Sequence, residues 1–258
     1  MIEFKKAART VQNRFPVLAS LKNRYYDYSR RYLRIAHERD FAIIALLPRS
    51  ENDLFLDIGS NRGQSILSIR AYRSDARIIS FEPNPAIYRQ TARHFAGDPL
   101  LTIENFGLGQ REGSFTLYIP TYRGLVYDGN ATCVRDVASQ YLSPDRLYFF
   151  DQTRVKIEEH PCTLKTLDSL DLSPSFIKID VEGFEYDVLA GGQTVLQKHQ
   201  PVLMFEREYC GSNVFDIVAR LGYEPVVVEN GRIARGDHGG LNVIMMTAER
   251  FKVCSTAI

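Results

Sequence analysis

The fold is decided by the stretch Asp53-Leu-Phe-Leu-Asp57-Ile-Gly59-Ser-Asn-Arg-Gly63-Gln-Ser65. An apolar run over 54–58 ends in a turn with two glycines four residues apart, and apolar residues then return at helical spacing over 66–69. This pattern predicts a buried strand, a tight loop and a helix. It is typical of the first unit of a doubly wound α/β sheet, in which ligands bind beyond the carboxyl ends of the strands.

The spacing of the two glycines indicates which ligand the loop would take. A dinucleotide site would show G-x-G-x-x-G, with the pyrophosphate on the helix N-terminus, but here the pattern is G-x-x-x-G and Asp57 precedes it. A carboxylate at this place repels a pyrophosphate and suits S-adenosylmethionine, whose methionine end carries an ammonium and a sulfonium. The alternative is that the glycines serve only the sterics of a strand-turn-helix unit.

Composition limits the class of protein. The chain has 258 residues, 45% hydrophobic content and a net charge of +1, which fits one sizeable globular α/β domain and gives no chain-wide field for nucleic acid. The charge is uneven, because residues 1–39 carry ten Lys or Arg against three acids. Their net +7 leaves −6 on the rest, so this basic arm either contacts an anionic surface or is a solvated helical face.

Cysteine spacing and hydropathy bear on location. The four cysteines lie far apart without a CxxC pair, so neither a zinc site nor a disulfide framework is expected. The longest apolar run, 41–47, is too short to span a bilayer, and no apolar signal core is present at the start. We therefore expect a cytoplasmic protein without a transmembrane segment.

Three regions are expected along the chain. Residues 1–49 lack glycine and show apolar residues three or four apart, which predicts a helical basic arm packed on the core. Residues 50–258 form the main domain. Within it, 118–162 is rich in aromatic residues and turn formers, and we interpret it as an insertion on the acceptor side.

Two further strands follow the glycine loop. The strand 77–82 ends in Glu82, 25 residues after Asp57, near the offset at which an acid of this fold binds ribose hydroxyls. Pro83-Asn84-Pro85 predicts a helix start. The strand 100–105 leads to Asn105 and Phe106, which would lie beside an adenine unless they form an ordinary turn.

The stretch Ser175-Phe-Ile-Lys178-Ile-Asp180-Val-Glu182-Gly-Phe-Glu185 carries the second signal. It predicts a buried strand on which Lys178, Asp180 and Glu182, two residues apart, point to one side. Charges buried in a parallel strand must pair with each other or with a ligand, so we favour a functional group over a purely structural Lys178–Asp180 ion pair. The strand 201–206 again ends in an acid, Glu206, and His238 lies on a glycine-rich link farther on.

Taken together, these motifs resemble the FkbM-type methyltransferases over residues 50–247. The residues that carry the resemblance are Asp57-Ile-Gly-Ser-Asn-Arg-Gly63, Phe81-Glu-Pro-Asn-Pro85, Asn105 with Gly109 and Gly113, Leu167-Asp-Ser-Leu170 and Ile177-Lys-Ile-Asp-Val-Glu-Gly-Phe-Glu185. The resemblance implies a Rossmann-like, seven-stranded mixed sheet with an antiparallel last hairpin and helices on both faces. It also implies S-adenosylmethionine as donor and transfer to a hydroxyl of a sugar, glycoconjugate or natural product.

The sequence thus predicts a donor site and a catalytic group. The donor-site residues are Asp57, Gly59, Ser60, Asn61, Gly63, Glu82, Pro83, Asn105 and Phe106. For catalysis we expect Asp180 as the base, Lys178 to keep it ionised or to stabilise a developing alkoxide, and Glu182 and Glu206 to bind or orient a small-molecule or glycan acceptor. Three alternatives stay open: Mg²⁺ on the three carboxylates, an NAD(P)-dependent oxidoreductase, and a non-catalytic protein that binds S-adenosylmethionine.

Overall fold

The computed structural model describes residues 6–7, 10–11, 36–50 and 53–256. The chain divides into two compact units, which we call the sheet unit (33–113 and 163–258) and the insert unit (1–32 and 114–162). Most of the expected helical arm, 1–49, lies outside the described residues. Its last part, Arg39–Leu46, forms the 3₁₀ helix η1 of the sheet unit. The expected domain limits stay a prediction.

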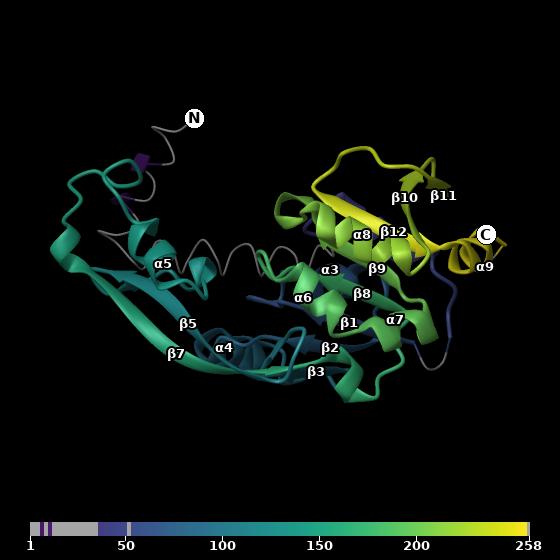
Figure 1. The fold of residues 1–258 in the computed structure, drawn as a ribbon, viewed down its shortest axis with the longest axis horizontal. Helices are drawn as coiled ribbons and strands as arrows, with labels where there is room; N and C mark the ends of the chain where they lie inside the picture. The colour runs from purple at the N-terminus through teal and green to yellow at the C-terminus, as the bar shows by residue number, and fades with distance from the viewer. Residues whose placement is uncertain (1–5, 8–9, 12–35, 51–52, 257–258) are drawn as a thin grey trace. The chain divides into compact units, whose positions relative to one another are not determined.

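An eight-stranded mixed sheet forms the centre of the sheet unit, in the order β11-β10-β12-β9-β8-β1-β2-β3 (Figure 1). Strands β3, β2, β1, β8 and β9 run parallel to one another. Strand β12 is antiparallel to both β9 and β10, and β10 is antiparallel to β11. The strands are β1 (Leu54–Ile58), β2 (Arg77–Phe81), β3 (Leu101–Glu104), β8 (Phe176–Ile179), β9 (Val202–Glu206), β10 (Tyr223–Glu229), β11 (Arg232–Arg235) and β12 (Asn242–Thr247).

This architecture confirms the predicted doubly wound sheet with an antiparallel last hairpin. It adds an eighth strand, because β11 pairs with β10 in the segment that the sequence indicated as a flexible link. Turn residues Asn230 and Gly231, both at positive φ, allow the tight connection between these two strands.

Helices cover both faces of the sheet and explain why its strands are apolar without alternation. Leu56 and Ile58 of β1 pack in one core with residues of α6, α7 and α8, whereas Phe55 packs in a second core with residues of η1, α3 and α9. Parallel strands buried on both faces require apolar residues at successive positions. The helices are α3 (Gln64–Tyr72), α4 (Pro85–His94), α6 (Glu185–Ala190), α7 (Gln193–His199), α8 (Ser212–Arg220) and α9 (Ala248–Thr256), with 3₁₀ turns η4 (Leu167–Leu170) and η5 (Arg207–Tyr209).

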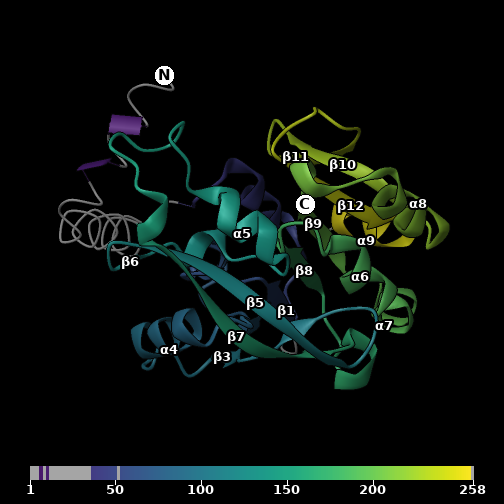
Figure 2. The same cartoon turned by 60° about the vertical axis from the view of Figure 1, so that its left-hand side comes forward.

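The insert unit is built on long strands. Strands β5 (Gly113–Tyr122) and β7 (Val155–Lys165) run side by side in a second sheet of order β4-β7-β5-β6 (Figure 2). Between them lie β6 (Leu125–Val126), η2 (Asp128–Asn130), α5 (Arg135–Tyr141) and η3 (Gln152–Arg154). The short β4 (Gly107–Leu108) pairs with the end of β7 inside the sheet unit.

Aromatic residues that the sequence placed in the insertion pack on one another. The rings of Tyr122 and Phe150 stack with centroids 5.6 Å apart in a core that also holds Leu142 and Leu147. Within the described part of the chain, no helix combines the length and the apolar character needed to cross a bilayer.

Candidate functional site

The first group of site residues follows β1. Asp57 is fully buried and lies opposite Ser80 of β2 and Lys178 of β8 in the strand register. The Ser80 hydroxyl donates a hydrogen bond of 3.0 Å to Asp57 Oδ2. Burial raises the pKa of Asp57 from 3.8 to about 6, and the Ser80 hydrogen bond and the Lys178 charge oppose this rise. The carboxylate is therefore held in a place where its charge is costly.

The glycine loop after β1 is packed against the loop after β8. Gly59 has φ of 89°, and a Cβ there would lie 1.9 Å from the carbonyl oxygen of Asp180. The backbone N–H groups of Gly59 and Ser60 both donate to the Phe81 carbonyl, at 3.0 and 3.1 Å. Only glycine fits this position, so the two loops meet backbone to backbone.

Glu82 follows β2 and is oriented by the backbone around it. One carboxylate oxygen accepts from the Asn61 N–H and the other from the Asn84 N–H, both at 2.8 Å. Asn84 also caps α4, since its side chain accepts from Ala86 N–H at 3.0 Å, as the sequence predicts. The glycine loop and the α4 start are thus fixed to the same carboxylate.

The residues predicted to meet an adenine lie beyond β3. Asn105 Nδ2 donates to the carbonyls of Glu82 at 2.8 Å and Pro83 at 3.2 Å, so it holds the turn after β2. Phe106 is buried, with its ring centroid 5.4 Å from that of Phe81 and 4.3 Å from the Lys165 ammonium. The structure thus brings Asn105 to the turn after β2, whereas Phe106, predicted to lie beside an adenine, packs in the core.

Several buried polar atoms at this edge of the sheet have no hydrogen-bond partner. Among the described residues, such atoms are Asp57 Oδ1, Ser60 Oγ, Asn84 Nδ2 and Arg73 Nε. The first three belong to the end of β1 and to the loops after β1 and β2. Because buried polar groups in native proteins are nearly always hydrogen-bonded to protein or to ordered water, each of these atoms is available to a polar partner that the described residues do not supply.

The second group of site residues surrounds the end of β8. Lys178 is 2% exposed, and its Nζ lies 3.1 Å from Asn242 Oδ1 and 3.5 Å from an Asp180 carboxylate oxygen. Lys178 and Asp180 lie side by side as predicted, but the predicted strand does not extend to Glu182, because β8 ends at Ile179 and Glu182 has a left-handed φ of 47°. Asp180, the first residue after the strand, lies beside the lysine, and the turn that follows carries Glu182.

Glu206, the last residue of β9, completes this carboxylate group. Burial and the neighbouring Asp180 raise the pKa of Glu206 from 4.5 to about 7, while the Lys178 charge opposes the rise. Burial and Asp180 also raise the pKa of Glu182. Carboxyls with raised pKa values beside a buried lysine are typical of acid–base sites.

Sequence reasoning gave no role to Glu185, although it ends the charged motif. Its side chain is fully buried and accepts from the N–H groups of Val181 at 3.3 Å and Gly183 at 3.0 Å. Glu185 therefore closes the turn that carries Asp180 and Glu182. An acid in the first turn of a helix, just after a glycine, is the signal that could have indicated this role.

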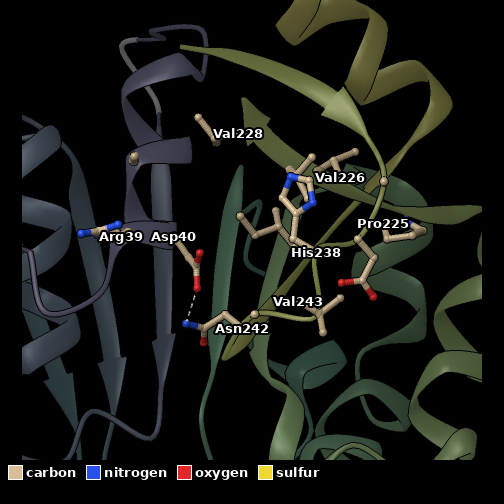
Figure 3. Close-up of a pocket in the computed structure, with 14 residues that line it drawn as sticks. Arg39, Asp40, Pro225, Val226, Val228, His238, Asn242 and Val243 are labelled. Carbon is tan, nitrogen blue, oxygen red and sulfur yellow. Dashed lines mark hydrogen bonds between the residues drawn. The ribbon is translucent and has the colours of Figure 1, made fainter. Parts of the chain in front are cut away.

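Asn242, the first residue of β12, was also missed. Its Nδ2 donates to Glu38 Oε2 at 2.5 Å and to Asp40 Oδ2 at 3.0 Å. Asp40 and Asn242 line a cavity of about 290 Å³ between η1 and strands β10 and β12, and His238 lies at its side (Figure 3). His238 Nε2 is 2.8 Å from Glu229 Oε1, so this histidine pairs outside the carboxylate group.

The described residues contain no group of three or more His, Cys, Asp or Glu side chains placed to hold a metal ion. The magnesium alternative therefore gains no support from the arrangement of Asp180, Glu182 and Glu206.

The strand order defines a class of fold, the Rossmann-like α/β sheet with an antiparallel last hairpin. Within it, the chain belongs to the FkbM methyltransferase family, because the family model of the methyltransferase FkbM domain matches residues 57–225. The predicted fold and family are confirmed.

Known relatives are distant. The chain is 29% identical over 194 residues to the AMB antimetabolite synthetase AmbE of Pseudomonas aeruginosa, a match over 67% of this chain and 9% of that protein. It is 24% identical over 159 residues to the 2-O-methyltransferase NoeI of Sinorhizobium fredii, a match over 60% of this chain and 63% of that protein. The chain thus spans less than two thirds of either relative.

A solved structure shares the fold. The methyltransferase FkbM of Methylobacillus flagellatus KT superposes with a TM-score of 0.50 at 16% identity, over 81% of this chain and 48% of that one.

Proposed function

We propose that this chain transfers the methyl group of S-adenosylmethionine to a hydroxyl oxygen of a small-molecule or glycan acceptor. The observation that carries the proposal is that Asp57, whose Oδ1 is buried without a partner, lies opposite Lys178 of β8, which in turn lies 3.5 Å from the Asp180 carboxylate. A donor and an acceptor would meet across the loops after β1 and β8. The name of NoeI, a 2-O-methyltransferase, supports oxygen as the methylated atom.

The residues present fit the donor. The Asp57 carboxylate, with Oδ1 unpartnered, suits the ammonium of the methionine end. Gly59 and Gly63 shape the loop through their positive φ and their close packing against Asp180 and Phe95. The N-terminus of α3 suits the ligand's carboxylate. Glu82, fixed by two backbone N–H groups, suits the ribose hydroxyls, and Asn105, which donates to the Pro83 carbonyl, would lie beside an adenine. Phe106 is buried in the core and would act only from behind this loop.

The acceptor side has to align an oxygen and remove its proton. When bound, S-adenosylmethionine supplies a methyl carbon whose bond to sulfur breaks with the electron pair leaving on sulfur. As the acceptor oxygen forms its bond to that carbon, the hydroxyl proton passes to a carboxylate oxygen of Asp180. The Asp180 side chain is 35% exposed, which gives an acceptor access, and one of its carboxylate oxygens lies 3.5 Å from the buried Lys178 ammonium. Glu182 and Glu206 would orient the acceptor.

An isotope assay tests the proposal. Protein incubated with labelled S-adenosylmethionine and a panel of hydroxylated acceptors, including sugars, sugar nucleotides and glycolipids, should give a methyl ether detected by mass. Asp180→Asn should reduce kcat by about 10²-fold or more, the range expected for a general base, with little change in donor affinity. The matched control is Asp216→Asn, an exposed position on α8. An Asp180→Asn protein that turns over normally would remove Asp180 as the base.

A further inference from the structure

Lys178 is buried, and its ammonium interacts with the carboxylates of Asp57, Asp180 and Glu206 and with one amide. Its Nζ lies 3.1 Å from the amide oxygen of Asn242 and 3.5 Å from the Asp180 carboxylate. Asn242 lies opposite Glu206 in the pairing of β12 with β9. A buried ammonium is costly unless acceptors surround it, so the position of Lys178 depends on this amide as well as on Asp180.

The orientation of the Asn242 amide follows from its partners. Its nitrogen faces the carboxylates of Glu38 and Asp40, which only accept hydrogen bonds, and its oxygen faces the ammonium of Lys178, which only donates them. Rotation of the amide by about 180° would break all three contacts. Charged partners on both sides also make these hydrogen bonds stronger than neutral ones.

We propose that Asn242 is a positioning residue that holds the Lys178 ammonium against Asp180 by anchoring it to Glu38 and Asp40. Asn242 and its two anchoring acids lie outside the region 57–225 that the family model matches. Residues before and after the matched region thus contribute to the contacts of Lys178 and Asp180. Figure 3 shows the contact between Asp40 and Asn242 at the cavity wall. The consequence for catalysis rests on the proposed function.

The contact itself is tested without turnover. In the full chain labelled with ¹⁵N-lysine, the buried, hydrogen-bonded Lys178 ammonium should exchange its protons slowly and give an Nζ signal, assigned by its loss in Lys178→Met. Asn242→Ala should abolish this signal, whereas the exposed control Asn213→Ala should retain it. Persistence of the signal in Asn242→Ala would overturn the proposal, and so would the absence of any slow Lys178 signal in the unaltered protein.

Kinetics test the catalytic consequence. Asn242→Ala should lower kcat about tenfold with donor affinity unchanged, and should change kcat by less than about twofold in a Lys178→Met background, since residues that act as a unit are not additive. The proposal would be overturned if the kcat losses of Asn242→Ala and Lys178→Met were additive, or if Asn242→Ala lowered Tm and left kcat unchanged. If the NMR result holds and no acceptor is methylated, the proposed function fails while the contact stands.

Exchanging the donor and acceptor groups around residue 242 gives a test by rescue of kcat. Asn242→Asp alone would face Glu38 and Asp40 with a third carboxylate, and kcat should fall. When Asn242→Asp is combined with Glu38→Gln and Asp40→Asn, the introduced carboxylate would accept from both new amides and from Lys178, so kcat should recover. Failure of the triple variant to exceed Asn242→Asp, with the fold intact by circular dichroism, would count against the anchor.

Discussion

At Asp57, burial disfavours the ionised carboxylate that the proposed donor site requires. It is fully buried, yet a donor site needs it ionised, and its pKa of about 6 reflects that conflict. The sequence revealed this residue because an acid two positions before a glycine turn is recognisable from spacing alone. Its hydroxyl partner, Ser80, could not be recognised, since the register that pairs β1 with β2 exists only in the folded sheet.

The raised pKa of Asp57 predicts a pH-dependent stability. Because this pKa is about 6 in the folded protein against 3.8 for an unperturbed aspartate, the folded state binds the proton more tightly. That stabilisation is complete below about pH 4 and is lost as the pH rises through about 6. The free energy of unfolding of Asp57→Asn, relative to the unaltered protein, should therefore rise by about 3 kcal/mol from about pH 3 to about pH 7. Urea titrations at both ends measure it, and a constant difference would contradict the account.

Glu206 predicts the pH dependence of turnover. Its pKa is raised to about 7 by burial and by Asp180, so the carboxylate pair gains a proton as the pH falls through that value. A protonated pair accepts the hydroxyl proton poorly, and kcat/KM should fall about tenfold per pH unit below about pH 7. Glu206→Gln should remove this limb of the pH–rate profile. A flat profile from about pH 6 to 8 for the unaltered protein would refute the prediction.

At the scale of elements, the site depends on two loops in contact, after β1 and after β8. Gly59→Ala would place a methyl group 1.9 Å from the Asp180 carbonyl at a φ of 89°. We expect a loss of at least about 2 kcal/mol in the free energy of unfolding and weaker donor binding. Gly222→Ala is the matched control, since its φ of 81° is similar and no atom lies within 4 Å of the added carbon.

Chemical denaturation and calorimetry of the two glycine variants separate the causes. The Gly222 variant reports the cost of the left-handed backbone alone, so a larger loss for Gly59→Ala measures the contact between the loops. Equal losses would mean that the loops separate easily, and the link between the donor side and Asp180 would then be lost.

The elements themselves were largely predictable. Strands β1, β2, β8 and β9, the α4 cap at Asn84 and the acids at the strand ends follow from apolar runs and turn residues. The end of β8 could not be predicted, because the alternating charges after Lys178 are also typical of a continuing strand. In the structure, Glu185 accepts hydrogen bonds from backbone N–H groups and so closes a turn there. Strand β11 was not predicted either, because it has only four residues and lies between two glycines.

At the scale of the whole molecule, long-range contacts set the limit of sequence reasoning. Asn242 is 64 residues from Lys178 and 204 from Glu38, and no spacing rule joins them. The insertion was recognised by its composition, yet its helix α5 and the length of β5 and β7 became clear only from the structure. The roles of the basic arm and of the insert unit toward an acceptor stay predictions.

The central claim is that a sulfonium nucleoside binds across the ends of β1 and β2. The most direct measurement is isothermal titration calorimetry of the full chain with S-adenosylmethionine, repeated with Glu82→Gln and with NAD⁺. The account predicts saturable one-site binding of S-adenosylmethionine, weakened about tenfold or more by Glu82→Gln, and no saturable binding of NAD⁺. Binding of NAD⁺ in place of S-adenosylmethionine, or no binding of either, would contradict it.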